Sequence, residues 1–181
     1  MRIVGGRFGG RRLAGPGRLR FRPTSDRLRE TLFDVLDDLV DGAVVLDAFA
    51  GTGAVGLEAL SRGARHATFV ESDRGVLAVL DANLTALGES DHVRVVRRPF
   101  DSVAGRIIDG GRGDRPLDIA FLDPPYDHPS LSAPLDLAAG LTRPGGLVIL
   151  EHARRREAPA TALAQDQAPL QVESRAVAPG G

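Results

Sequence analysis

Short apolar runs alternate along the chain with longer segments of helical periodicity, and this alternation limits the possible folds strongly. The apolar runs lie near residues 43–48, 67–71, 93–97, 117–122 and 146–151. Predicted helices lie near residues 25–41, 54–62, 74–87, 101–109 and 130–140. Strands that are apolar almost throughout are buried on both faces, which is typical of parallel sheets. The sequence therefore predicts an α/β fold, a mostly parallel twisted sheet with helices on both faces.

Three acidic residues stand at the ends of apolar runs, namely Asp47, Glu71 and Asp123. The carboxyl ends of parallel strands meet at one edge of a sheet, and α/β proteins bind their ligands there. We therefore expect the three carboxylates to converge on a ligand site.

A glycine-rich turn follows the first run, with glycines at positions 51, 53 and 56 before a predicted helix. Such a turn lets a ligand approach the backbone, and the helix N-terminus presents free N–H groups. Glu71, twenty residues after Gly51, can accept both hydroxyls of a ribose. The pattern fits nicotinamide, flavin or S-adenosylmethionine cofactors, and a tight turn without a ligand is the structural alternative.

The position of Asp47, four residues before Gly51, helps to choose among these cofactors. A carboxylate repels a pyrophosphate, whereas it attracts the sulfonium and ammonium groups of S-adenosylmethionine. The charge of Asp47 therefore favours S-adenosylmethionine over a nicotinamide dinucleotide.

The segment Asp123-Pro124-Pro125-Tyr126 directly follows the run 117–122 and suits a flat nitrogen-bearing ring. Asp123 supplies an acceptor for an amino hydrogen, and Pro124, which lacks an N–H, offers a carbonyl acceptor. Tyr126 can stack on a base, a contact worth roughly 1–3 kcal/mol. A Pro-Pro turn that only closes a strand is the alternative, and the glycine turn upstream favours the functional interpretation.

Positive charge is concentrated at the beginning of the chain. The first 30 residues contain nine arginines and two acids, the rest contain 14 arginines and 22 acids, and the net charge is −1. An arginine-rich segment with interspersed glycines suits RNA phosphates, and a solvated hairpin is the alternative. We expect a basic N-terminal arm or β-hairpin, residues 1–22, and a catalytic domain, residues 23–181, in one globular unit.

Composition argues against other kinds of site. The chain has no cysteine, and its four histidines show no ligand spacing, so we expect no metal. It also lacks a run of 18 apolar residues and an N-terminal secretory signal. We therefore expect a cytoplasmic protein without a membrane span, and a monomer is the simplest assumption.

Five blocks carry a family resemblance: Arg2 to Gly6, Arg22 to Phe33, Asp47 to Arg62, Glu71 to Asp73 and Asp123 to Tyr126. Together they resemble the bacterial 16S ribosomal RNA (guanine-N2)-methyltransferases of the small-subunit methyltransferase D type, across nearly the whole chain. Many DNA, RNA and protein amino-methyltransferases share the Asp-Pro-Pro-Tyr motif, so this motif alone does not identify the family. The block Arg22 to Phe33 is the one that favours the rRNA methyltransferases. The resemblance implies a Rossmann-like class I S-adenosylmethionine-dependent methyltransferase fold.

The resemblance also implies site residues and a partner. The implied catalytic residues are Asp123, Pro124, Pro125 and Tyr126. The implied cofactor-binding residues are Asp47, Ala48, Phe49, Gly51, Gly53, Glu71, Ser72, Asp73, Phe100 and Asp101. The implied RNA contacts are Arg2, Arg7, Arg11, Arg12, Arg22, Arg27 and Arg29. The implied partner is 16S rRNA or the assembling small ribosomal subunit.

The chain departs from the family pattern at two places. Relatives have an acidic or amide residue, then a small one, after the third strand, where this chain has Arg97 to Asp101. Here Asp101 can reach the adenine amino group, and Phe100 can pack on the ring. Beyond a predicted sixth strand at Leu170 to Val177, no sequence remains for the final antiparallel strand of this fold.

The expected reaction is methyl transfer from S-adenosylmethionine to the exocyclic N2 amine of a guanine in 16S rRNA. Three alternatives stay open: an amino-methyltransferase for DNA adenine or protein glutamine, a nicotinamide-dependent oxidoreductase, and a non-catalytic RNA-binding relative. The oxidoreductase alternative leaves the Asp-Pro-Pro-Tyr segment without a use, and substrate assays separate the others.

Overall fold

The computed structural model describes residues 1–15, 17, 25–89, 91–107, 116–125, 128–152 and 170–175. Within these residues one sheet has the strand order β3-β2-β1-β4-β5-β6, and all its strand pairings are parallel. The strands are β1 (Val44–Asp47), β2 (His66–Val70), β3 (Val93–Val96), β4 (Leu117–Leu122), β5 (Thr142–His152) and β6 (Leu170–Arg175). The predicted strands are confirmed, although β5 begins at Thr142 rather than near residue 146.

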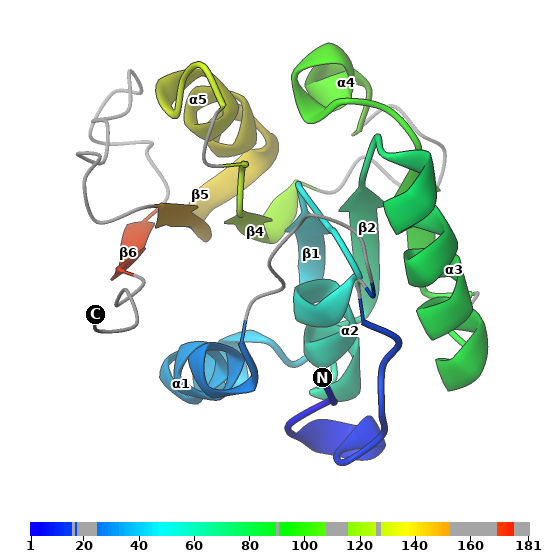
Figure 1. Cartoon of the computed structure of the whole chain (residues 1–181). Coiled ribbons are helices and arrows are strands. Elements are labelled where there is room, and N and C mark those ends of the chain that lie inside the picture. Colours follow the sequence, from blue (N-terminus) through cyan, green and yellow to red (C-terminus); the bar gives the residue numbers. More distant parts are fainter. Residues whose placement is uncertain are drawn as a thin grey trace, which may run out of the picture.

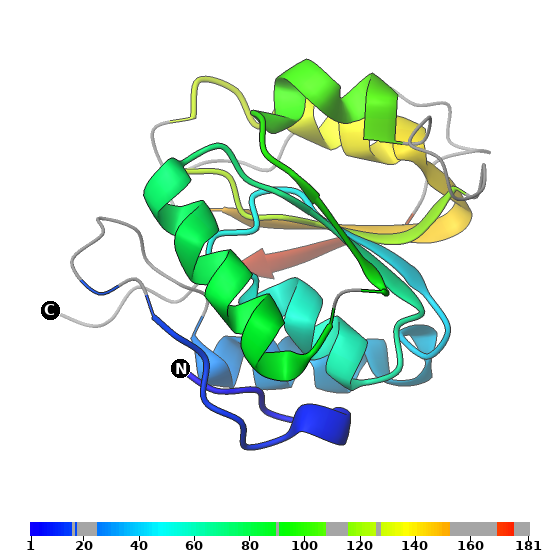
Figure 2. The same ribbon diagram turned by 90° about the vertical axis from the view of Figure 1, so that its right-hand side faces the viewer.

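The helices lie in two layers on either side of this sheet. They are α1 (Asp26–Leu36), α2 (Ala54–Ser61), α3 (Arg74–Leu87), α4 (Phe100–Ile107) and α5 (Ser132–Leu141). Helices α1, α2 and α3 cover one face, whereas α4 and α5 cover the other (Figure 1, Figure 2). No helix within the described ranges is long and apolar enough to span a membrane.

Successive residues of the central strands face opposite layers, because side chains alternate along a strand. On β1, Val45 belongs to the same buried cluster as Phe33 of α1. The next residue, Leu46, belongs to the cluster that contains Leu135 of α5. Both layers are apolar, which explains why the central strands appear in the sequence as continuous apolar runs.

Helix α1 is shorter than predicted. The Oγ of Ser25 accepts a hydrogen bond from the N–H of Leu28 at 3.2 Å, which caps the helix as expected. The α-helix ends at Leu36 because Asp37 adopts a positive φ of 40°, and a short 3-10 turn, η2 (Asp37–Leu39), follows. The predicted continuation to residue 41 is therefore wrong, and Leu39 is 59% exposed rather than on the buried face.

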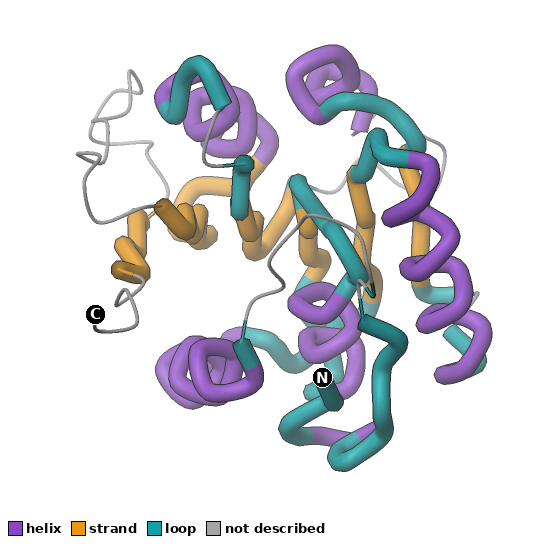
Figure 3. Tube along the Cα trace, in the orientation of Figure 1, coloured by secondary structure: helices purple, strands orange, loops and turns teal. Residues whose placement is uncertain are grey.

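The N-terminal segment, residues 1–15, folds back on itself beside α2 (Figure 3). The N–H of Ile3 donates to the carbonyl of Arg11, and the N–H of Gly10 donates to the carbonyl of Ile3, both at 2.9 Å. Ile3 and Leu13 are buried in the apolar cluster that α2 and α3 share. The segment also contains a 3-10 turn, η1 (Gly6–Phe8). It is thus packed on the domain by its own apolar side chains.

Candidate active site at the carboxyl ends of the strands

The fold brings Asp47, Glu71 and Asp123 to one edge of the sheet. In the parallel register Asp47 pairs with Phe69 of β2 and with Phe121 of β4. Glu71 and Asp123 each lie two residues beyond those partners. They therefore lie at the same position along the strand direction, one on each side of β1. Two spacings between neighbouring strands separate their Cα atoms by roughly 10 Å. The prediction that the three acids meet at one edge of the sheet is confirmed, and a ligand site there stays a prediction.

Asp47 is buried under the glycine turn. Its side chain is 5% exposed, and its Oδ2 accepts a hydrogen bond from the N–H of Gly56 at 2.9 Å. Burial raises the pKa of Asp47 to about 7, and the charge of Glu71 adds to the rise, whereas the bond from Gly56 lowers it. A cation bound nearby would favour the ionised form of Asp47. The carboxylate therefore fits the positive end of a ligand.

The carboxylate of Glu71 is held by three backbone N–H groups. Its Oε2 accepts from Gly51 at 3.0 Å, and its Oε1 accepts from Ser72 at 2.7 Å and from Asp73 at 2.9 Å. A carboxylate has about four lone-pair sites, so one of them is left over from these bonds for a ligand hydroxyl. The side chain of Asp73 caps α3 by accepting from the N–H of Val76 at 2.9 Å.

The glycines of the turn serve both backbone conformation and packing. Gly51 and Gly53 have positive φ angles of 55° and 79°, which favour glycine. A Cβ on Gly53 would lie 2.4 Å from the Cδ1 of Leu80, and one on Gly56 would lie 2.3 Å from the Cε1 of Phe69. Gly53 and Gly56 therefore let α2 pack closely on β2 and α3. Ala48, in the loop after β1, is also buried.

Phe49, in the loop after β1, contacts two other rings at this edge. Its centroid lies 5.8 Å from that of Phe100 and 5.7 Å from that of His128, both edge to face. The Nε2 of His128 lies 3.3 Å from the Oδ2 of Asp101, and its Nδ1 lies 2.5 Å from the carbonyl of Ser130. His128 thus joins the loop after β4 to the loop after β1 and to the first turn of α4.

One predicted cofactor residue at this edge, Phe100, differs from its prediction. Phe100 is 2% exposed and belongs to the core, and this burial argues against the predicted packing of its ring on adenine. Asp101, in contrast, is exposed. His128 is not among the residues predicted from the sequence, although its place two residues after Tyr126 is a signal for such a role.

The segment after β4 begins with Asp123, which is partly buried, followed by the buried Pro124 and the exposed Pro125. The carbonyl of Pro125 accepts a hydrogen bond from the N–H of His128 at 2.8 Å. Tyr126 lies outside the described residues, so its stacking role stays a prediction. No group of His, Asp or Glu side chains in the part of the chain that the structure describes is arranged to hold a metal ion.

Most of the predicted RNA contacts lie on the surface. The side chains of Arg2, Arg11, Arg12 and Arg27 are exposed. Arg7 is 50% exposed, although it forms an ion pair with Glu89 at 2.7 Å. Arg22 lies outside the described residues. Exposure keeps four of these arginines available to a polyanion, and their contact with RNA stays a prediction.

Arg29 is not available to a partner, and its prediction as an RNA contact is wrong. Its side chain is 0% exposed, donates to the Oδ1 of Asp26 at 2.7 Å and lies 4.0 Å from the carboxylate of Glu58, which is also 0% exposed. Glu58 in turn accepts hydrogen bonds from the N–H groups of Val4 at 2.7 Å and Gly5 at 2.8 Å. This buried pair fixes the N-terminal segment to α1 and α2.

The parallel sheet, the glycine turn after β1 and the acid after β2 define the Rossmann-like class I fold of S-adenosylmethionine-dependent methyltransferases. A solved Escherichia coli structure, "Putative methyltransferase yhhF", matches with a TM-score of 0.65 at 39% identity. The match covers 78% of this chain and 73% of that chain. The predicted fold class is confirmed.

The chain belongs to the family described as Conserved hypothetical protein 95, whose model matches residues 1–167. It is 34% identical over 163 residues to "Putative rRNA methyltransferase YlbH" of Bacillus subtilis, covering 89% of this chain and 87% of that relative. It is 42% identical over 137 residues to "Ribosomal RNA small subunit methyltransferase D" of Escherichia coli, covering 76% of this chain and 66% of that relative. The predicted resemblance to the methyltransferase D family is confirmed, and the chain spans just under two thirds of that E. coli relative.

Proposed function

We propose that this protein transfers a methyl group from S-adenosylmethionine to the exocyclic N2 amine of a guanine in 16S rRNA. The observation that carries the proposal is the convergence of Asp47, Glu71 and Asp123 at one sheet edge, with the Pro-Pro segment directly after the third acid. The names of the relatives support rRNA as the substrate class. The reaction would take place in the cytoplasm, with the protein acting as a monomer.

The residues at the edge fit S-adenosylmethionine. Glu71 would accept one ribose hydroxyl, since its bonds to Gly51, Ser72 and Asp73 leave it one lone-pair site. Asp47 would face the cationic part of the ligand, and Asp101 would accept a hydrogen of the adenine amino group. When bound, S-adenosylmethionine supplies an electrophilic methyl group on a sulfonium cation.

The segment after β4 would hold the base that receives the methyl group. Asp123 and the carbonyl of Pro124 accept the two amino hydrogens and so orient the nitrogen lone pair, which is otherwise delocalised into the guanine ring. Tyr126 would stack on the base, which must leave the RNA stack to reach this edge. As the N–C bond forms and the S–C bond breaks, Asp123 or water takes the proton from the nitrogen. The protein would accelerate this reaction by positioning the two reactants, without a covalent enzyme intermediate.

A transfer assay with parallel substrates tests the proposal. Labelled S-adenosylmethionine is offered with 16S rRNA, small ribosomal subunits, DNA and protein. We expect label in RNA or subunits. Label in DNA or protein instead would favour an amino-methyltransferase for adenine or glutamine, and RNA binding without any transfer would favour a non-catalytic relative.

A further inference from the structure

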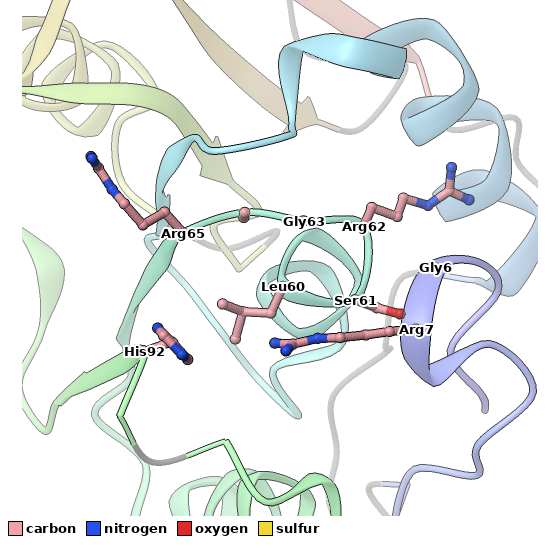
Figure 4. A pocket seen from close by; sticks show the side chains of 9 residues that line it. Gly6, Arg7, Leu60, Ser61, Arg62, Gly63, Arg65 and His92 are labelled. Atoms are coloured by element: carbon pink, nitrogen blue, oxygen red, sulfur yellow. The ribbon is translucent and has the colours of Figure 1, made fainter.

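A hollow lies at the opposite edge of the sheet from the candidate active site. It has a volume of about 430 Å³, and its lining includes Arg7, Leu60, Ser61, Arg62, Arg65 and His92. In Figure 4 the side chains of Arg7 and His92 point toward each other across this hollow, whereas Arg62 and Arg65 extend outward from its rim. We call it the basic pocket.

The basic pocket is far from the residues proposed for methyl transfer. Arg65 immediately precedes β2 and His92 immediately precedes β3, so both stand at the amino ends of strands whose carboxyl ends form the candidate site. From His66 to Glu71 the chain of β2 advances five residues, or roughly 16 Å at 3.3 Å per residue. A ligand that touches both sites must therefore be extended.

The arginines of the basic pocket keep exposed N–H donors, although carboxylates lie close to them, including the 67% exposed Asp34, whose Oδ1 lies 3.9 Å from the Nη1 of Arg62. Two of these arginines are paired from beneath: Arg7 with Glu89 at 2.7 Å, and Arg62 with Glu58 at 2.9 Å. Glu89 and Glu58 are 6% and 0% exposed, whereas the two arginine side chains are 50% and 22% exposed. Because a guanidinium has five N–H donors, one carboxylate contact leaves donors for an anion at the surface.

Two features oppose anion binding: the exposed carboxylates of Asp34 and Asp41 near the rim, and the end of a helix. The C-terminal end of α2, which carries a partial negative charge, lies at the basic pocket. Its last carbonyls already accept hydrogen bonds from the N–H groups of Arg62, Gly63 and Ala64. The groups that remain to bind an anion are the exposed Arg65 and the exposed donors of Arg7.

The basic surface also continues beyond the basic pocket. The guanidinium of Arg7 lies 4.6 Å from the ring centroid of Phe8, and that of Arg11 lies 5.8 Å from it. Cations thus run from the pocket along residues 7–11 of the N-terminal segment. A continuous track of cations suits the regularly spaced phosphates of a polynucleotide better than a single small anion.

We propose that the basic pocket binds a backbone phosphate of the RNA substrate while the modified base lies at the other edge. This inference rests on the proposed function. At 3.4 Å per stacked nucleotide, the separation of roughly 16 Å corresponds to about five nucleotides, so only a substrate of at least that length reaches both sites. Contact at the basic pocket contributes affinity and orientation rather than chemistry.

The test uses the double variant Arg65→Ala/His92→Ala, which leaves the buried pairs of Arg7 and Arg62 intact. Binding of small subunits and of 16S rRNA is measured at several salt concentrations. Loss of one phosphate contact should lower the magnitude of the slope of log K against log salt by roughly 0.7 to 0.9. In transfer assays KM for RNA should rise with kcat unchanged, while binding of S-adenosylhomocysteine should not change.

Arg143→Ala is the matched control, because it removes a positive charge at the same sheet edge but outside the basic pocket. Burial raises the pKa of Asp118, and Arg143 and Arg65 bring it below its ordinary value, so both variants disturb the same carboxylate. The control should keep the wild-type salt slope. Thermal unfolding of each variant checks that the fold is retained.

Several outcomes would overturn the proposal. One is a double variant with the wild-type salt slope and KM. Another is an equal change in the Arg143→Ala control, which would indicate a general charge effect. A third is stabilisation of the wild type alone by inorganic phosphate that does not compete with RNA, which would mark a site for a free anion. If RNA binds with the predicted salt slopes but no methyl is transferred, the proposed function is wrong. The proposal that the basic pocket binds an RNA phosphate is then still supported.

Discussion

Asp47 keeps its proton to about pH 7 in the folded protein, whereas an ordinary aspartate loses it near pH 3.8. Between these values the folded state binds more protons than the unfolded state, so stability falls as the pH rises. At 1.36 kcal/mol per pKa unit the fall is on the order of 4 kcal/mol between about pH 4 and pH 7. Asp47→Asn should make this fall shallower, as measured by denaturant unfolding at pH 5 and pH 8. An unchanged pH dependence would contradict the assignment.

The same proton gives a test of the cofactor site. A sulfonium bound near Asp47 favours the carboxylate, so binding should release up to one proton at pH 6.5. Calorimetry of S-adenosylmethionine binding in two buffers of different ionisation enthalpy measures this release. The Asp47→Asn variant is the control and should release less. Equal release from both proteins would show that another group titrates.

His128 should position Asp101 rather than contact the cofactor itself. Replacing His128 by Ala removes the 3.3 Å contact with Asp101, so Kd for S-adenosylhomocysteine should rise roughly three- to tenfold, an effect on the order of 1 kcal/mol. The double variant His128→Ala/Asp101→Ala should bind about as weakly as Asp101→Ala alone, because both changes act on one interaction. Additive losses in calorimetry would argue that the two residues act separately.

At the residue scale, the sequence predicted the side chains that follow buried strands and missed those defined by tertiary contacts. Asp47, Glu71 and Asp123 could be placed together because parallel strands end at one edge. Arg29 sits in an arginine-rich region, and nothing local shows that Glu58, 29 residues further on, pairs with it in the core. The contact between His128 and Asp101 likewise depends on how the loop after β4 packs on the start of α4.

At the element scale, close packing of α2 on β2 is the feature that glycine makes possible. Gly56→Ala would place a Cβ 2.3 Å from the fully buried ring of Phe69, so we expect a loss of roughly 1–3 kcal/mol in the free energy of unfolding. Gly140→Ala in α5 is the matched control, because no atom lies within 4 Å of the added Cβ there. That change should stabilise the protein by up to about 1 kcal/mol. Similar stability for both variants in denaturant unfolding would contradict this view of the turn.

The elements themselves were predicted well wherever burial sets the pattern. Apolar runs located β1 to β5, and the periodicity located α2 and α3 to within about a residue of their observed ends. The end of α1 was missed because it depends on the backbone angle of Asp37, which has no clear signature in the sequence. The direct pairing of β6 with β5 was also beyond prediction, since a strand pattern does not specify its neighbour.

At the scale of the whole molecule, the two edges of the sheet would have different roles in binding the substrate. The carboxyl edge carries the three acids proposed to hold cofactor and base, and the amino edge carries the basic pocket proposed to hold phosphate. Glu58 ties the N-terminal segment, which supplies Arg7 to the basic pocket, to α2, whose preceding glycine turn lies at the active-site edge. One rigid domain could thus fix the distance between a contacted phosphate and the modified base.

The most direct test of the central claim is to identify the methylated nucleoside. Small subunits and 16S rRNA are incubated with labelled S-adenosylmethionine, and the RNA is digested and analysed by nucleoside mass spectrometry. We expect the label in N2-methylguanosine with the wild type and none with Asp123→Ala, although that variant should still bind S-adenosylhomocysteine. Label in another nucleoside, or undiminished transfer by Asp123→Ala, would contradict the proposed reaction.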